Sequence, residues 1–90
     1  MNSSSLKSTP RAVSVACSDD ELRVSLSEGR WLSVPLAWFP RVAHASASSR
    51  SNYELLGEGQ GIHWPDIDED ISVAGLLAGQ PSAEAAPVPA

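Results

Sequence analysis

Hydrophobic and polar residues alternate along three consecutive runs in the first forty residues. Alternation with a period of two is typical of β-strands that bury one face. Because the runs are short and separated by polar segments, the pattern predicts an antiparallel meander of three strands. The apolar positions are Val13, Val15 and Cys17, then Leu22, Val24 and Leu26, then Leu32, Val34 and Leu36.

The lengths of the two intervening turns define the expected register of this meander. Apolar residues of neighbouring strands must face each other on one side of the sheet, and a two-residue turn at Asp19-Asp20 satisfies that condition. A three-residue turn at 27–29 satisfies it too, and such a turn needs a left-handed last residue, where the chain has Gly29. The expected pairs are Cys17–Leu22, Val15–Val24 and Val13–Leu26, followed by Val24–Leu32 and Leu22–Val34.

The opposite face of the meander is polar apart from one tryptophan. Its residues are Glu21, Arg23, Ser25, Trp31 and Ser33. Trp31 either packs beside Ser25, is covered by another element, or stays exposed as part of a partner surface, since aromatic residues are enriched at interfaces. The sequence leaves these alternatives open.

The segment after the third run predicts two short helices. Pro40 suits the first position of a helix running to about Ala45, and Ser46 suits the cap of a second one running to about Ser51. Helices this short need tertiary packing to be stable. The residues spaced to cover the apolar face of the sheet are Trp38, Phe39 and Val42.

The remainder of the chain predicts a second hairpin and a last helix. Strands are expected at Tyr53–Leu56 and Gly61–Trp64, joined by a glycine-rich turn, and their register stays open. An acidic loop then enters a short helix, which either Ser72 or Asp70 caps and Gly79 ends.

The two ends of the chain lack residues that could build a core. Residues 1–10 are rich in Ser and Thr and residues 80–90 in Pro and Ala, so we expect both to be disordered tails. We therefore predict one α+β domain at residues 11–79. It contains a small antiparallel sheet, made of the three-stranded meander plus the second short hairpin, packed with two or three short helices. A domain of this size buries only about 60% of its unfolded surface, so a homodimer interface would add stability.

Charge and cysteine content narrow the class of protein. The chain has 11 acidic and 6 basic side chains and a net charge of −5. Negative charge repels phosphate backbones, so direct nucleic-acid binding is disfavoured and a basic protein partner fits better. The single Cys17 is expected to be a reduced core thiol. The N-terminus has no basic region followed by an apolar one, and no apolar run approaches a membrane span of about 20 residues, so we expect a cytoplasmic protein.

One acidic motif has part of the spacing of a calcium-binding loop. Asp66, Asp68 and Asp70 occupy the first, third and fifth positions. However, Ile71 stands where the turn needs glycine, and Leu77 stands where the loop needs a bidentate glutamate. The motif therefore does not predict calcium binding.

Other chemical motifs are equally incomplete. The glycine run at 57–61 lacks the Lys and Ser/Thr of a phosphate-binding loop. His44 and His63 have no partners at metal-ligand spacing, and no serine lies in a nucleophile-elbow context. The sequence thus predicts no catalytic residue, no metal and no cofactor, and therefore not an enzyme.

These observations favour a protein-interaction module that binds a basic partner through an acidic surface with aromatic anchors. A transcriptional regulator that binds DNA as a dimer is the alternative, and it would require an arginine-lined face. A small enzyme or metal protein has the least support. The candidate partner-binding residues are Trp31, Trp64, Asp66, Asp68, Glu69 and Asp70.

Three segments of the chain also carry a family resemblance. They are PRAVSVACSDDELRVSLSEGRWLSVPL, then WFPRVAHAS followed by RSNYELLGEG, then QGIHWPDIDEDISVAGLLAG. Together they resemble the small bacterial proteins of the domain-of-unknown-function family numbered 2442, whose fold is a small antiparallel sheet with short helices. Members are often encoded beside small toxin-like partners, so the resemblance implies an antitoxin-like or adaptor role, with a small basic toxin as one candidate partner. Some members are fused to a helix-turn-helix domain, but nothing after Gly79 could form one, so the resemblance does not imply DNA binding here. It implies no catalytic residues.

Overall fold

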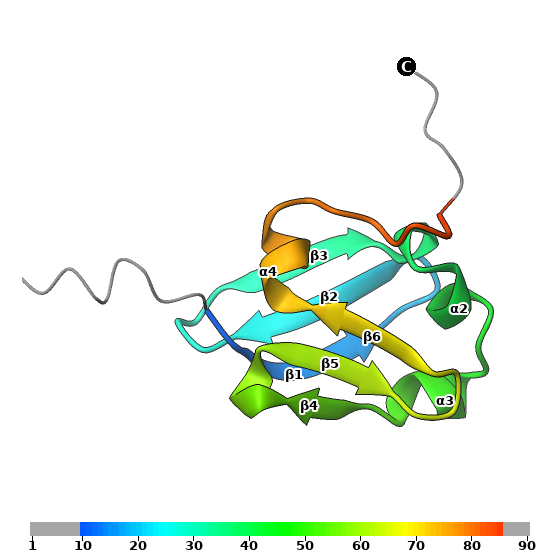
Figure 1. The fold of residues 1–90 in the computed structure, drawn as a ribbon, viewed down its shortest axis with the longest axis horizontal. Helices are drawn as coiled ribbons and strands as arrows, with labels where there is room; N and C mark the ends of the chain where they lie inside the picture. Colours follow the sequence, from blue (N-terminus) through cyan, green and yellow to red (C-terminus); the bar gives the residue numbers. More distant parts are fainter. Residues whose placement is uncertain (1–9, 86–90) are drawn as a thin grey trace, which may run out of the picture.

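The computed structural model describes residues 10–85, which fold into two three-stranded antiparallel sheets with short helices (Figure 1). The expected α+β class is confirmed. The tails predicted at residues 1–10 and 80–90 lie largely outside the described residues, except for Pro10 and residues 80–85.

The first sheet, called sheet A, is the predicted meander. It contains β1 (Ala12–Cys17), β2 (Glu21–Leu26) and β3 (Trp31–Pro35) in that order. Gly29 takes the left-handed conformation that the second turn needs, with φ of 99°. Four expected pairs are present: Cys17–Leu22, Val15–Val24, Val24–Leu32 and Leu22–Val34.

The fifth expected pair, Val13–Leu26, is wrong. The register shifts between Ala12 and Ser14, so Ala12 pairs with Leu26 and Val13 is the extra residue of a β-bulge. Ala12 is buried, and Val13 is 57% exposed. The bulge therefore gives the core position to Ala12.

Three short helical segments follow sheet A. They are the 3-10 turn η1 (Leu36–Trp38), α2 (Pro40–Ala43) and α3 (Ala47–Ser51). Pro40 occupies the start of α2, as predicted. Ser46 caps α3, because its hydroxyl oxygen accepts a hydrogen bond from the backbone N–H of Ser49 at 3.1 Å.

The second sheet, called sheet B, has one strand more than the predicted hairpin. It contains β4 (Glu54–Leu56), β5 (Gly61–Trp64) and β6 (Glu69–Ser72), with the 3-10 turn η2 (Gly57–Gly59) between β4 and β5. The segment expected as a loop up to the last helix thus contains β6. Pairing with β5 provides the backbone hydrogen bonds that make it a strand.

The last helix, α4 (Val73–Leu77), has its N-terminal cap and its terminating glycine at predicted residues. Of the two candidate caps, the structure uses Ser72, whose hydroxyl accepts a hydrogen bond from Gly75 N at 2.8 Å. At the other end, Gly79 has φ of 74°. The bonds Gly79 N to Leu76 O and Gln80 N to Gly75 O form a Schellman motif.

Buried residues of both sheets and of the helices form one hydrophobic core. Apart from Ala12, the residues that sheet A supplies were predicted by the first sequence pattern. The segment from Leu36 to Val42, sheet B and α4 supply the rest. The members are Ala12, Leu22, Val24, Leu26, Val34, Leu36, Phe39, Val42, Ile62, Trp64, Ile71, Val73 and Leu76.

A close backbone contact joins the two sheets. Gly59 in η2 has φ of 99°, and a Cβ atom at this position would lie 2.3 Å from the carbonyl oxygen of Ala12. Beside it, Arg11 and Glu58 form an ion pair at 2.9 Å. A side chain at position 59 would push η2 away from β1, so glycine is needed both for its conformation and for its size.

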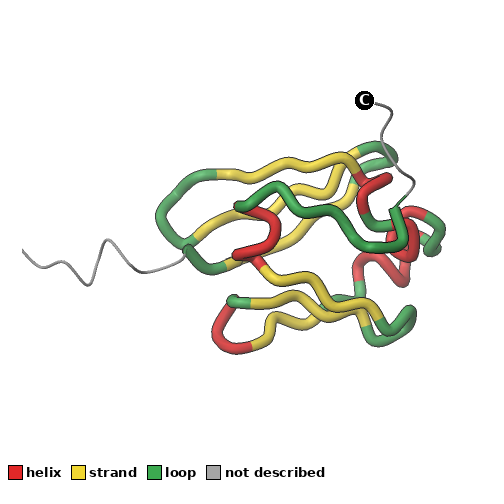
Figure 2. Tube along the Cα trace, turned by 45° about the horizontal axis from the view of Figure 1, so that its top comes forward, coloured by secondary structure: helices red, strands yellow, loops and turns green. Residues whose placement is uncertain are grey.

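Residues 80–85, called the C-terminal strap, cross from α4 back to the helices (Figures 1 and 2). Ser82 N donates a hydrogen bond to Trp38 O at 2.9 Å, and Glu84 pairs with Arg41 at 2.9 Å. The packed chain therefore continues past the boundary expected at Gly79, as far as Ala85.

Candidate interaction surface

The outer face of sheet B carries a row of charged side chains. The register places Glu54 of β4, His63 of β5 and Asp70 of β6 opposite one another. Side chains alternate between the faces of a strand, so the neighbouring Ile62 and Ile71 point to the core, where both are buried. The row is consequently fixed by the same alternation that builds the core.

The turn between β5 and β6 adds two more carboxylates. Asp66 and Asp68 are both exposed there, and Asp68 has a left-handed backbone with φ of 51°. With Glu54 and Asp70 they form what we call the acidic surface. In residues 10–85, none of Glu54, Asp66 and Asp68 makes an ion pair.

His63 lies among these carboxylates. Its Nδ1 is 2.5 Å from Oδ1 of Asp70. That hydrogen bond is the main cause that raises the pKa of His63, with the charges of Asp70, Glu54 and Asp68 acting in the same direction and burial opposing them. The surrounding carboxylates thus favour the protonated, positively charged form of His63.

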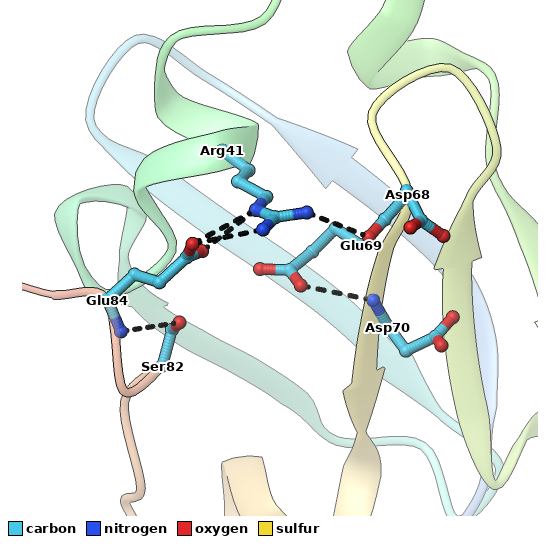
Figure 3. Close-up of polar contacts among 6 residues, drawn as sticks. All are labelled: Arg41, Asp68, Glu69, Asp70, Ser82 and Glu84. Atoms are coloured by element: carbon cyan, nitrogen blue, oxygen red, sulfur yellow. Dashed lines mark hydrogen bonds and ion pairs between the residues drawn. The ribbon is translucent and has the colours of Figure 1, made fainter.

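Glu69 lies on the other side of β6 from Asp70, between that strand and the C-terminal strap (Figure 3). Its Oε1 accepts a hydrogen bond from Asp70 N at 3.2 Å, and its Oε2 is buried without a hydrogen-bond partner. Burial raises the pKa of this carboxyl. Glu69 is therefore not part of the exposed acidic surface.

Arg41 connects the strap to the β5–β6 turn. Its guanidinium donates to both carboxylate oxygens of Glu84 and, at 3.3 Å, to the carbonyl oxygen of Asp68 (Figure 3). The pKa of Arg41 is raised, first by the hydrogen bond to Glu84. One arginine therefore holds the turn and the strap near each other.

Trp64 does not belong to the predicted partner surface. Its side chain is fully buried, with 0% exposure, and its indole N–H donates to the carbonyl oxygen of Arg50 at 3.0 Å. Because the ring fills the core and its polar atom has a partner inside the protein, Trp64 cannot contact another molecule in this fold. Its inclusion among the candidate binding residues was wrong.

Trp31 is exposed, but on the other sheet. It is 55% exposed on the outer face of sheet A, and the guanidinium carbon of Arg23 lies 5.1 Å from the ring centroid. This cation–π contact partly covers the ring. The structure thus separates Trp31 from the acidic surface, and the six predicted residues do not form one site.

Sequence reasoning did not select the apolar residue of the acidic surface. Leu56 is 43% exposed and lies in the row Leu56–Gly61–Ser72, beside Glu54, His63 and Asp70. The available signal was alternation within β4, which places Glu54 and Leu56 on the same face. Alternation alone could not place Leu56 next to His63 and Asp70, because the register of this hairpin was open.

Reactive and metal-binding groups are sparse in the described part of the chain. Cys17 is half-buried, and burial raises the pKa of its thiol, which makes it less reactive. In residues 10–85, no three His, Cys, Asp or Glu side chains converge in a way that could hold a metal ion. None of the helices there has the length and apolar character to cross a membrane.

Comparisons with known proteins give a family but no activity. The family model described as a protein of unknown function, DUF2442, matches residues 12–82. None of the curated proteins matches the chain.

Two solved structures are similar. A crystal structure of a protein of unknown function from Rhodospirillum rubrum has a TM-score of 0.72 and 30% identity, covering 86% of this chain and 95% of the other. A solution NMR structure of an uncharacterized protein from Chromobacterium violaceum has a TM-score of 0.69 and 21% identity, covering 82% of this chain and 70% of the other. The second likeness concerns the fold alone.

Proposed function

The chain belongs to the DUF2442 family, and we propose that it is a non-catalytic protein-interaction module that binds a basic partner through the acidic surface. The observation that carries this proposal is the set of exposed carboxylates gathered on sheet B, of which Glu54, Asp66 and Asp68 make no ion pair within residues 10–85. Uncompensated carboxylates create a negative potential that attracts cationic surfaces.

The surface offers more than charge. Leu56 is exposed beside the carboxylates, so a partner can bury apolar area while its basic residues pair with the rim. Protein interfaces typically combine such exposed apolar area with charged side chains. Charge raises the association rate, and buried apolar area supplies much of the affinity.

The arginines weigh against the DNA-binding alternative. Arg11, Arg30 and Arg41 are paired with carboxylates. Arg50 donates to the carbonyl oxygens of Val42 and Ala43. A phosphate backbone would have to compete with these partners, and Arg23 stacks on Trp31, so residues 10–85 offer no ready arginine-lined face.

The family resemblance supports a more specific version of the proposal. In it, the chain is an antitoxin-like or adaptor protein in the cytoplasm, and the basic partner is a small toxin. The acidic surface would then cover a basic functional region of that partner.

Partner capture tests the general proposal. The variant Asp66→Asn/Asp68→Asn/Asp70→Asn removes three charges from the acidic surface, and Asp19→Asn/Asp20→Asn/Glu21→Gln removes three exposed charges from sheet A. Proteins captured from a lysate by the unaltered chain should be lost with the first variant and kept with the second. Their retention should also fall as salt concentration rises. An unchanged set of partners with the first variant would exclude the acidic surface.

A further inference from the structure

β6 is an edge strand whose outer side is open to pairing. Sheet B has the order β4-β5-β6, and Val73 N donates to Gln60 O at 2.9 Å in continuation of the β5–β6 ladder. Because antiparallel ladders alternate between bonded and non-bonded pairs, the register turns the backbone groups of Asp70 and Ser72 away from β5. These groups form the free edge of sheet B.

Within residues 10–85, few groups bond to this edge. There, Asp70 N–H donates only to the carboxylate of the preceding residue, Glu69, at 3.2 Å. The C-terminal strap passes the edge without pairing: its Ser82 N bonds to Trp38 O, and within residues 10–85 no backbone hydrogen bond joins the strap to β6. Asp70 O and Ser72 N are therefore placed to accept and donate bonds to another chain.

A slot separates the edge from the strap. It has a volume of about 280 Å³, and Phe39, Ile71 and Leu76 contribute apolar walls. On the strap side the lining residues include Ser82 and Ala83, whose side chains are too small to fill it. Figure 3 shows the Glu69 carboxylate in the space between β6 and Ser82, and its Oε2 has no hydrogen-bond partner.

We propose that an extended, basic segment of the partner protein enters this slot and adds to sheet B as a fourth strand. Main-chain bonds to Asp70 O and Ser72 N supply the strand pairing. A lysine or arginine of the segment pairs with the partly exposed carboxylate of Glu69, which lines the slot. This inference rests on the proposed function and specifies how the basic partner is held.

Charge complementarity selects this occupant over others. Glu69 and Asp70 line the slot, and the turn that carries Asp66 and Asp68 directly precedes β6. A second copy of this edge would bring the same carboxylates together, and like charges directly opposite destabilise strand pairing. A positively charged strand is instead attracted by each of these carboxylates.

The test uses the full chain labelled with ¹⁵N and a synthetic six-residue peptide of alternating lysine and valine as the probe. Binding should shift the Asp70 and Ser72 amide signals and slow hydrogen exchange at Ser72 at least tenfold, since its N–H becomes bonded. The same peptide with N-methylated valines keeps its charge but loses backbone donors, and it should bind at least tenfold more weakly.

Two matched variants test the role of Glu69. Glu69→Gln removes the charge in the slot and should weaken peptide binding about tenfold, the loss of one charge-assisted contact. Glu21→Gln removes one exposed charge from β2 of sheet A, outside the acidic surface, and should change the affinity by less than about threefold.

The outcomes separate this inference from the proposed function. Shifts confined to the outer face around Glu54 and His63, with Ser72 unaffected, would overturn strand addition and leave the acidic surface as the binding site. Equal affinity of the two peptides would also overturn it. No shift anywhere with millimolar peptide would count against both proposals.

Discussion

The two sheets share one topology and one core, but they present different chemistry to the outside. Each is a three-stranded antiparallel meander whose inner residues join the same hydrophobic cluster. The outer face of sheet A carries serines, a single acidic residue, Glu21, and the Arg23–Trp31 pair. The outer face of sheet B carries Glu54, His63 and Asp70 in a row.

This difference shows that folding and partner recognition use alternate positions of the same strands. The inward positions are constrained by packing, and the outward ones are free to vary in charge without disturbing the core. Sheet B also has β6 as an edge beside an unfilled slot. On the sheet A side, Tyr53 already covers part of the β1 edge, because its hydroxyl oxygen accepts a hydrogen bond from Val15 N at 3.1 Å.

The largest difference in stability between a buried and an exposed position is expected at the two tryptophans. Trp64→Ala removes a fully buried ring and its hydrogen bond to Arg50 O, and it should lower the free energy of unfolding by about 3–5 kcal/mol. Trp31→Ala removes an exposed ring and one cation–π contact, at a cost of about 0.5–1 kcal/mol. Urea unfolding of both variants measures the contrast. Similar losses would contradict the assignment of Trp31 to the surface.

The joint between the sheets can be tested with two glycines of equal φ. Gly59 and Gly29 both have φ of 99°, but a Cβ at Gly59 would meet Ala12 O, whereas a Cβ at Gly29 would meet nothing within 4 Å. Gly29→Ala should cost about 1–2 kcal/mol for its conformation alone. Gly59→Ala adds a steric clash and should cost about 2–5 kcal/mol. Equal decreases in melting temperature for the two variants would show that η2 does not press on β1.

Sheet A was predictable because two independent constraints agree there. Apolar alternation gave the faces, and turn lengths that bring Val24 opposite both Val15 and Leu32 gave the register. The bulge at Val13 was not predictable, since Ala12 and Val13 are both apolar and the pattern does not say which one enters the core.

Sheet B was predictable only in part, for a physical reason. β6 contains a single apolar residue, Ile71, so it has no alternation of its own and becomes a strand through pairing with β5. The strap was missed because, beyond Gln80, one backbone bond, Ser82 N to Trp38 O, and one ion pair, Arg41–Glu84, attach it to the helices. Trp64 was wrongly assigned to the partner surface because acidic residues follow it directly in sequence. In the structure its side chain lies in the core, whereas most of those acidic side chains lie on the surface.

Glu69 allows a test of how much a charged carboxylate in the slot lowers the stability of the folded protein. Burial raises the pKa of this carboxyl, so the folded state binds its proton more tightly than the unfolded state does. Near neutral pH the charged group therefore lowers stability, and this penalty disappears as the pH falls below the raised pKa. Glu69→Gln should unfold at a higher temperature than the parent near pH 7, and the gap should close in acid. Glu54→Gln, at an exposed position, should show no comparable gap.

The smallest expected effect concerns His63, which links the acidic surface to pH. Its hydrogen bond to Asp70 raises its pKa, so protonation is tighter in the folded state. The stabilisation is fully present below the ordinary pKa of about 6.5 and is lost as the pH rises through the raised value. The melting temperatures of the parent and His63→Gln should therefore differ most below pH 6 and converge in mildly alkaline buffer. In an Asp70→Asn background the difference should shrink, because the main partner that raises the pKa is gone while the charges of Glu54 and Asp68 remain. The same titration makes the surface more negative as the pH rises, so a basic partner should bind more tightly above the His63 pKa than below it. Binding that weakens over that range would place the partner elsewhere than on sheet B.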